Sequence, residues 1–94
     1  MEWKIKDGCV EKSVNQFLNT GAPVPENSTL IGRYHAPGSV KGWLIVETDD
    51  LNTIYKHTTE WAELLHFKTT PVVTDQNAAQ VCSEVWRYGN QSSD

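Results

Sequence analysis

The stretch that decides the fold is residues 30–47, which read LIGRYHAPGSVKGWLIVE. Two runs rich in β-branched and aromatic residues flank a Pro-Gly turn, a composition typical of a β-hairpin. We predict one strand near residues 29–35 and another near residues 42–48. These strands carry a basic, an imidazole and an indole side chain, so pocket chemistry is expected here.

The segment before the hairpin predicts one strand and one helix. Trp3 and Ile5 alternate with charged residues, which is the period of a strand with one apolar face. From residue 10 the apolar spacing changes to the i, i+4, i+7, i+8 pattern of an amphipathic helix. Its apolar stripe comprises Val10, Val14, Phe17 and Leu18. Thr20-Gly21 should end this helix, before a proline-stiffened loop at residues 22–27.

Two more helices and one more strand are predicted after the hairpin. Asp50 can cap a helix with its carboxylate. The apolar stripe of that helix is expected at Leu51, Ile54, Thr58, Trp61, Ala62 and Leu65. Residues 67–73 predict a last strand, which Pro71 places at a sheet edge or strand end. Asp75 should cap a third helix, and the expected stripe is Ala78, Val81 or Cys82, Val85 and Trp86.

This order of elements predicts an α+β, ferredoxin-like βαββαβ fold with an extra C-terminal helix. Both crossover helices then cover the same side of a four-stranded antiparallel sheet and leave the other face bare. We predict a single domain at residues 1–88 and a polar tail at residues 89–94. A chain of 94 residues hides only about 60–65% of the surface that its unfolded form exposes, so a second subunit could supply missing burial.

The bare face is expected to combine apolar and ionisable side chains. If the helices cover Leu44, then Trp43 and Glu47 project the other way, although the hairpin register remains open because a one-residue slip exchanges faces. A surface of this mixed kind favours a cavity enclosed between two facing sheets of a homodimer. The residues expected to line this small-molecule cavity are Arg33, His35, Trp43 and Glu47.

Each of these side chains has a functional and a structural interpretation. His35 could take or give a proton, or it could hydrogen-bond to a turn carbonyl or a carboxylate. Arg33 could bind a ligand carboxylate or phosphate, or it could pair with Glu47 across the hairpin. Trp43 could stack on an aromatic ligand or simply pack in the interface.

Composition and motifs argue against several classes of protein. Eight Lys and Arg residues against twelve Asp and Glu residues give a net charge of -4, and the basic residues form no stripe. Nucleic acid is therefore not expected as a partner. The sequence has neither a secretory signal nor an apolar run of about 20 residues, so we predict a cytoplasmic protein without a membrane partner.

No cofactor or metal site is predicted. Cys9 and Cys82 are expected to be buried or half-buried thiols, not a disulfide or zinc site. Four possible ligands recur at three-residue intervals but lack the His-x-x-x-His spacing that holds one ion. These residues, predicted to lie on a solvated helix face, are His57, Glu60, Glu63 and His66.

The pattern of Gly32-Arg33-Tyr34-His35, Gly42 to Asp49, Trp61 and Pro71-Val72-Val73 resembles an uncharacterised family of short bacterial and phage proteins. This is a domain of unknown function within the dimeric α+β barrel superfamily, and the resemblance covers roughly residues 3–85. It implies a homodimer of ferredoxin-like subunits and no established activity. Proteins of this architecture include cofactor-free monooxygenases, haem-degrading enzymes and stress-responsive proteins, so the architecture alone does not choose among functions.

The sequence supports three hypotheses about function. The first is a module that binds a small organic molecule, anionic or aromatic. The second is a small cofactor-independent enzyme of monooxygenase or isomerase type, in which His35 acts as general base and Arg33 stabilises developing negative charge. The third is a non-catalytic accessory or interaction protein. The residues leave open whether the protein is an enzyme.

Overall fold

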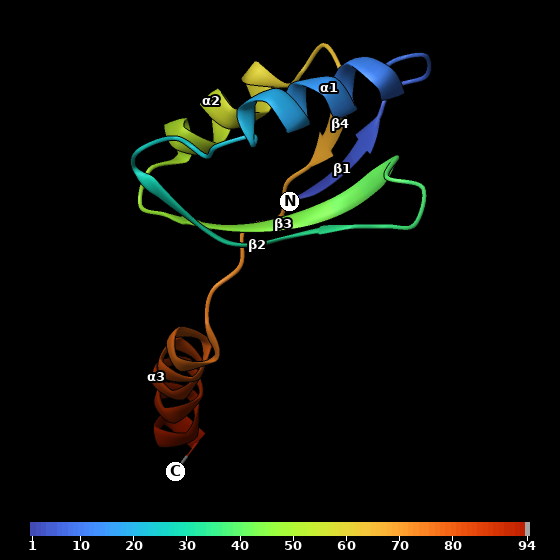
Figure 1. The fold of residues 1–94 in the computed structure, drawn as a ribbon. Coiled ribbons are helices and arrows are strands. Elements are labelled where there is room, and N and C mark those ends of the chain that lie inside the picture. Colours follow the sequence, from blue (N-terminus) through green and yellow to red (C-terminus); the bar gives the residue numbers. More distant parts are fainter. Residues whose placement is uncertain (94) are drawn as a thin grey trace.

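The computed structural model describes the backbone of residues 1–93 and the side chains of residues 1–87. Two helices lie on one face of a four-stranded sheet, and a third stands apart (Figure 1). In chain order the elements are β1 (Glu2–Ile5), α1 (Val10–Thr20), β2 (Ser28–His35), β3 (Lys41–Thr48), α2 (Leu51–Glu60), β4 (Leu65–Lys68) and α3 (Asp75–Ser93). The strand order is β2-β3-β1-β4 and neighbouring strands are antiparallel. The predicted ferredoxin-like α+β fold is confirmed.

Two helix boundaries follow the predicted capping chemistry. At the end of α1, Gly21 adopts a left-handed conformation with φ of 71°, and its N–H donates to the carbonyl of Phe17 at 2.7 Å. At the start of α2, Oδ1 of Asp50 accepts from the N–H of Asn52 at 2.9 Å. Both positions were predicted from residue type alone, and both are confirmed.

The region between α2 and α3 differs from the prediction. Helix α2 ends at Glu60, before the predicted stripe is complete, and β4 occupies Leu65–Lys68 instead of residues 67–73. The reason is the partner strand. β1 has four residues, and its pairing with β4 runs from Ile5 opposite Leu65 to Glu2 opposite Lys68. Beyond Lys68 no ladder remains, so Pro71 falls in the connection to α3.

A bulge sets which side chains of β2 face the helices. Leu30 pairs with Val46, whereas Gly32 pairs with Ile45, so one extra residue is inserted at position 31. A bulge of this kind changes the parity of the strand, and it places Leu30 on the same face as Arg33. This is the face that the two helices cover.

The core lies between the sheet and these helices. Its buried members are Trp3, Ile5 and Leu44, and only 2% of the Leu44 surface is exposed. Partly buried side chains surround them: Met1, Cys9, Leu30, Val46, Leu65 and Phe67. Cys9 is half-buried, as predicted. The core is small, consistent with a chain of this length.

We expect Gly42→Ala to destabilise the protein by about 1–3 kcal/mol, because the added methyl overpacks the core. A Cβ at this position would collide with the Trp3 indole and with the backbone oxygen of Tyr34. Gly32→Ala is the matched control, since its Cβ would meet only the side chain of Tyr34, which is exposed and can turn away. Urea denaturation of both variants measures the effect, and equal losses would contradict this packing.

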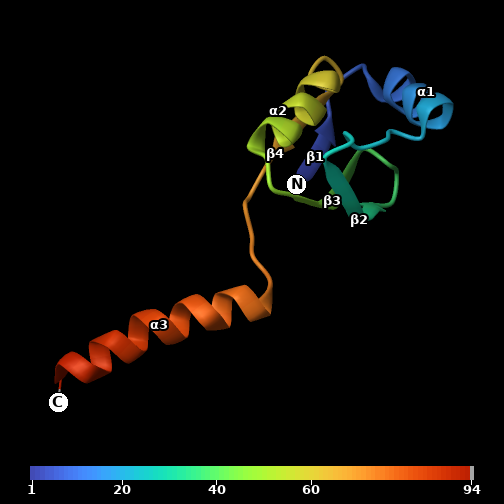
Figure 2. The ribbon, with the colours of Figure 1, turned by 90° about the vertical axis from the view of Figure 1, so that its left-hand side faces the viewer.

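Helix α3 stands clear of the rest of the molecule (Figure 2). The radius of gyration is 17.9 Å, whereas a compact chain of this length has about 12 Å. The helix begins at Asp75, which was predicted to cap it, but the capping side chain is Thr74, whose Oγ1 accepts from the N–H of Asn77 at 3.2 Å. The helix continues through residues 89–93, where the sequence predicted a polar tail. The last residue of that tail, Asp94, lies outside the described residues. Cys82 is exposed, so the prediction that it is at least half-buried was wrong.

Candidate functional site

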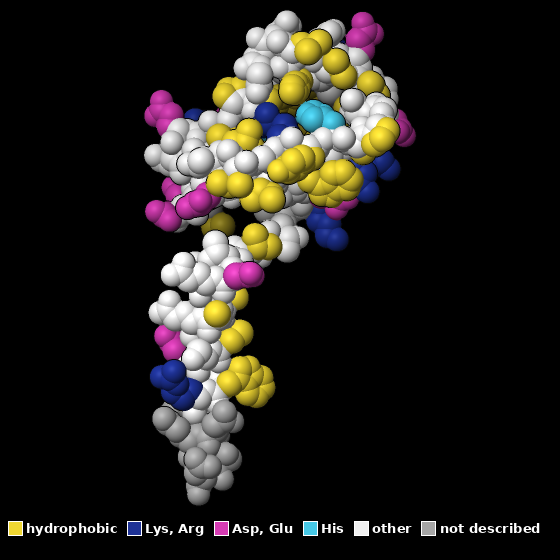
Figure 3. All heavy atoms as spheres, turned by 60° about the horizontal axis from the view of Figure 1, so that its bottom comes forward, with side chains coloured by type: hydrophobic (Ala, Val, Ile, Leu, Met, Phe, Trp, Pro, Cys, Tyr) yellow, Lys and Arg dark blue, Asp and Glu magenta, His cyan; other side chains and the backbone are white. Residues whose placement is uncertain are grey.

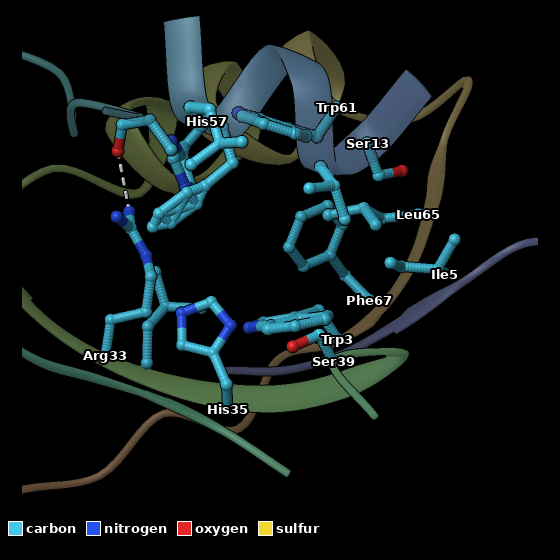
Figure 4. A pocket seen from close by; sticks show the side chains of 15 residues that line it. Trp3, Ile5, Ser13, Arg33, His35, Ser39, His57, Trp61, Leu65 and Phe67 are labelled. Carbon is cyan, nitrogen blue, oxygen red and sulfur yellow. Dashed lines mark hydrogen bonds between the residues drawn. The ribbon is translucent and has the colours of Figure 1, made fainter. Parts of the chain in front are cut away.

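A cavity of about 210 Å³ lies between the sheet and helices α1 and α2. Figure 4 shows Trp3 and His35 on its sheet side, with His57 and Trp61 entering from the helices. Most of the lining is apolar, and the aromatic rings are those of Trp3, Phe17, Trp61 and Phe67. The polar side chains in the lining are Ser13, Arg33, His35, Ser39 and His57. A concave apolar site with a few convergent polar groups is the usual form of a small-molecule pocket.

Arg33 supplies a fixed positive charge to this cavity. Its Nη2 donates to the carbonyl of Ala22 at 2.7 Å (Figure 4), and its Nη1 donates to the carbonyl of Gly21 at 3.4 Å. Burial lowers the pKa of Arg33 from its ordinary value, and a guanidinium stays charged at neutral pH. The ion pair formed by the described residues joins Lys41 to Glu2, not Arg33 to a carboxylate. The charge is therefore oriented by the loop after α1 without being neutralised.

His35 lies beside two aromatic rings. Its ring centroid is 5.3 Å from that of Trp3, edge-on at 70°, and 5.2 Å from that of Phe17. Because strand pairing places His35 opposite Gly42, its ring lies over the same sheet face as Arg33. The two residues that the sequence singled out in β2 thus meet in one cavity.

His57 is a buried imidazole that the sequence analysis misplaced. Only 4% of its surface is exposed, and its Nδ1 has no hydrogen-bond partner among the described residues. Burial lowers the pKa of His57 below its ordinary 6.5, the positive charge of Arg33 lowers it further, and Glu60 acts in the opposite direction. His57 is consequently neutral at pH 7 and can donate or accept a hydrogen bond.

The prediction of a solvated helix face at His57 was wrong because the buried side of α2 is rotated from the predicted stripe. The buried residues are Thr53, His57 and Trp61, spaced by four, whereas Leu51 is 78% exposed. This i, i+4, i+8 spacing around Trp61 is a signal that the sequence contains. A second buried polar atom, Oγ of Ser13 in α1, also has no partner among the described residues.

Trp43 and Glu47 do not join Arg33 and His35. Residue 43 pairs with Tyr34 and residue 47 with Thr29, so both side chains lie on the sheet face away from the helices. The expected set is therefore divided between two faces, and the pairing of Arg33 with Glu47 is not formed. The division arises because Arg33 pairs with Leu44. Leu44 is buried under the helices, so Arg33 lies on the helix-covered face of the sheet.

Neither a membrane-spanning helix nor a cluster of metal ligands occurs among the described residues. Within residues 1–93, no helix is both long and apolar enough to cross a membrane. Across the same part of the chain, His, Cys, Asp and Glu side chains form no group of three that could hold a metal ion.

Comparison with known proteins identifies a family. No curated protein and no solved structure matches the chain significantly. A family model described as a domain of unknown function (DUF3303) matches residues 1–85. The predicted place in the dimeric α+β barrel superfamily and the bacterial or phage origin are not tested by this match and stay predictions. Because the match covers most of the 94 residues, the chain belongs to the DUF3303 family.

Proposed function

We propose that the protein binds a small organic anion with an aromatic body in the cavity between the sheet and the helices. The observation that carries this proposal is the guanidinium of Arg33, held by two backbone carbonyls at the wall of a largely apolar cavity. A partly buried cation without a carboxylate partner among the described residues favours an anionic ligand, because the ligand compensates its desolvation.

The size and lining of the cavity favour a single-ring ligand. Its volume of about 210 Å³ exceeds the roughly 150 Å³ of an apolar cavity that accommodates benzene. The ring of the ligand would lie among Trp3, Phe17 and Trp61, where offset or edge-on aromatic contacts form. The neutral imidazole of His57 can hydrogen-bond to a carboxylate or hydroxyl of the ligand, which gives its unpaired Nδ1 a partner.

We also propose that the protein is a homodimer. The sheet face away from the helices, here called the open face, exposes 57% of Tyr34, 42% of Trp43 and 50% of Ile45. A contiguous apolar surface of this kind is typical of a protein interface. The ligand cavity lies within one subunit, so dimerisation is proposed here for stability and not to enclose the ligand.

We expect benzoate to raise the melting temperature and to bind measurably by calorimetry, whereas benzyl alcohol and acetate bind far more weakly. Benzyl alcohol lacks the negative charge, and acetate lacks the ring. Arg33→Gln should weaken benzoate binding about 10- to 100-fold, since a hydrogen bond to a charged group contributes about 1.5–3 kcal/mol.

Lys41→Gln is the matched control for Arg33→Gln. Lys41 is a cation on the open face, paired with Glu2 at 3.1 Å and lying 5.4 Å from the ring centroid of Trp43. Its loss should leave benzoate affinity unchanged. Equal binding of benzoate and benzyl alcohol, or an Arg33→Gln variant that binds like the unaltered protein, would contradict the proposal.

A further inference from the structure

We infer that α3 of one chain packs across the open face of a second copy, so that two chains exchange their C-terminal helices in a symmetric dimer. The inference rests on the proposed homodimer and is independent of ligand binding. It assigns the element that forms the interface and the surface that receives it. Both surfaces belong to this chain, and each is apolar and uncovered (Figure 3).

The helix surface is a continuous stripe. Four neighbouring side chains on α3 form it: Val81, 57% exposed; Cys82, also exposed; Val85, 59% exposed; and Trp86, 69% exposed. The spacing i, i+1, i+4, i+5 puts them on one side of a helix. Most of the stability of a helix in a protein comes from packing of its apolar face and not from helix propensity. The stripe therefore needs a partner surface.

The position of α3 directs it to the open face. Figure 1 shows α3 on the side of the sheet opposite α1 and α2, which is the side that carries Trp43 and Ile45. The connection, residues 69–74, can span up to about 20 Å when extended. This reach lets the helix leave its own domain and meet another while the two domains stay side by side.

The charges on the open face and on α3 also favour contact between these two surfaces. Lys4 and Lys68 lie on the open face, because they alternate with the core-facing Trp3 and Phe67 along their strands. The described part of α3 carries Asp75 and Glu84 against a single Arg87. The same face also carries Lys41, Glu2 and Glu47, so its net charge is +1, against a net charge of -1 on the described part of α3. This modest complementarity fixes orientation more than affinity.

When both contacts form, the exposed apolar area comes close to the area that a stable dimer buries. At about 150–250 Å² for each fully exposed aromatic, the uncovered parts of Tyr34, Trp43 and Trp86 amount to roughly 300 Å² per chain. The aliphatic side chains on both surfaces add to this area, and a two-fold axis doubles the total. The sum approaches the lower end of the range for specific interfaces, about 1,200–2,000 Å².

The test cross-links two different chains, both carrying Cys9→Ala. One chain carries Ile45→Cys and Cys82→Ser, and the other keeps its natural Cys82. After the chains are mixed and allowed to exchange, a short bismaleimide should join them into a species of twice the chain mass that neither chain gives alone. Sedimentation of the unaltered protein should show a dimer, and circular dichroism should show that each variant is folded.

Each of the other cross-linking or sedimentation results would overturn a specific part of the inference. A link between two Ile45→Cys chains means that sheet meets sheet, and a link between two Cys82 residues means that α3 meets α3. Either result overturns the exchange and keeps the dimer. In a third variant, Cys9→Ala with Ile45→Cys and the natural Cys82, a link within the chain and none between chains means that α3 folds back on its own sheet. Sedimentation at the mass of one chain overturns the dimer itself.

A second measurement does not depend on cross-linking. Val85→Glu places a charge in the stripe, and it should raise the dissociation constant of the dimer at least tenfold. Gln80→Glu adds the same charge on the opposite side of α3, and it should leave the dissociation constant unchanged. Equal effects of the two variants would overturn the role of the stripe.

Discussion

Replacing Leu44 with alanine should lower the free energy of unfolding by about 2–5 kcal/mol, the usual cost of emptying a buried leucine site. Leu44 is 2% exposed on the central strand β3, and its side chain lines the cavity. A chain of 94 residues has a total stability of about 5–14 kcal/mol. The variant should therefore lose a large share of its stability, and urea denaturation at pH 7 measures the loss.

Leu51→Ala is the matched control for Leu44→Ala. It removes the same atoms from the first residue of α2, where 78% of the leucine is exposed. Its cost should stay within about 0.5 kcal/mol, as for most surface substitutions. Comparable losses at the two positions would mean that the helices do not cover the face of the sheet that carries Leu44.

The fold could be predicted because local signals agree with one another. A period of two at Trp3 and Ile5, a helical period from Val10 and a Pro-Gly turn between two strands each specify one element. Capping residues then fixed the end of α1 and the start of α2. The limits of β4 could not be predicted, because they depend on the length of its partner β1 and not on residues near Pro71.

The site could be predicted only in part, because strand faces depend on register. Arg33 and His35 were singled out correctly as neighbours, yet they lie under the helices and not with Trp43. Gly32 is a local sign of the bulge, because a glycine inside a strand often marks one, but it does not show where the extra residue is inserted, and that position sets the parity of the strand. Residue type indicated which side chains carry chemistry, and only the pairing shows on which side of the sheet they act.

His57 was missed for a different reason. It was grouped with residues at three-residue intervals, whereas the structure buries it with Thr53 and Trp61 at intervals of four. The buried side of α2 contains a threonine and a histidine, so its apolar pattern is weak. The predicted stripe was therefore placed on the side of the more apolar Leu51 and Ile54. Polar residues at core positions are themselves a sign of a functional cavity.

The buried state of His57 predicts a loss of stability in mildly acidic solution. Its pKa is lower in the folded protein than the ordinary 6.5 of an unfolded chain, first through burial and then through the charge of Arg33, with Glu60 opposing. The unfolded chain therefore binds a proton that the folded protein does not. The contribution of His57 to stability is complete above pH 6.5, and it declines as the pH falls toward the folded-state pKa, by at most about 1.4 kcal/mol per pH unit.

His57→Gln removes this titration while it keeps a polar side chain of similar reach. Between pH 7.5 and 5.5 the unfolding free energy of the variant, from urea denaturation, should fall less steeply than that of the unaltered protein. His66→Gln is the matched control, because His66 is an exposed histidine on β4, and it should retain the full slope. If His57→Gln keeps the slope and His66→Gln loses it, His57 is not the group that is protonated on unfolding. An anion bound beside Arg33 would favour protonated His57, so saturating benzoate should flatten the profile of the unaltered protein and leave that of His57→Gln unchanged.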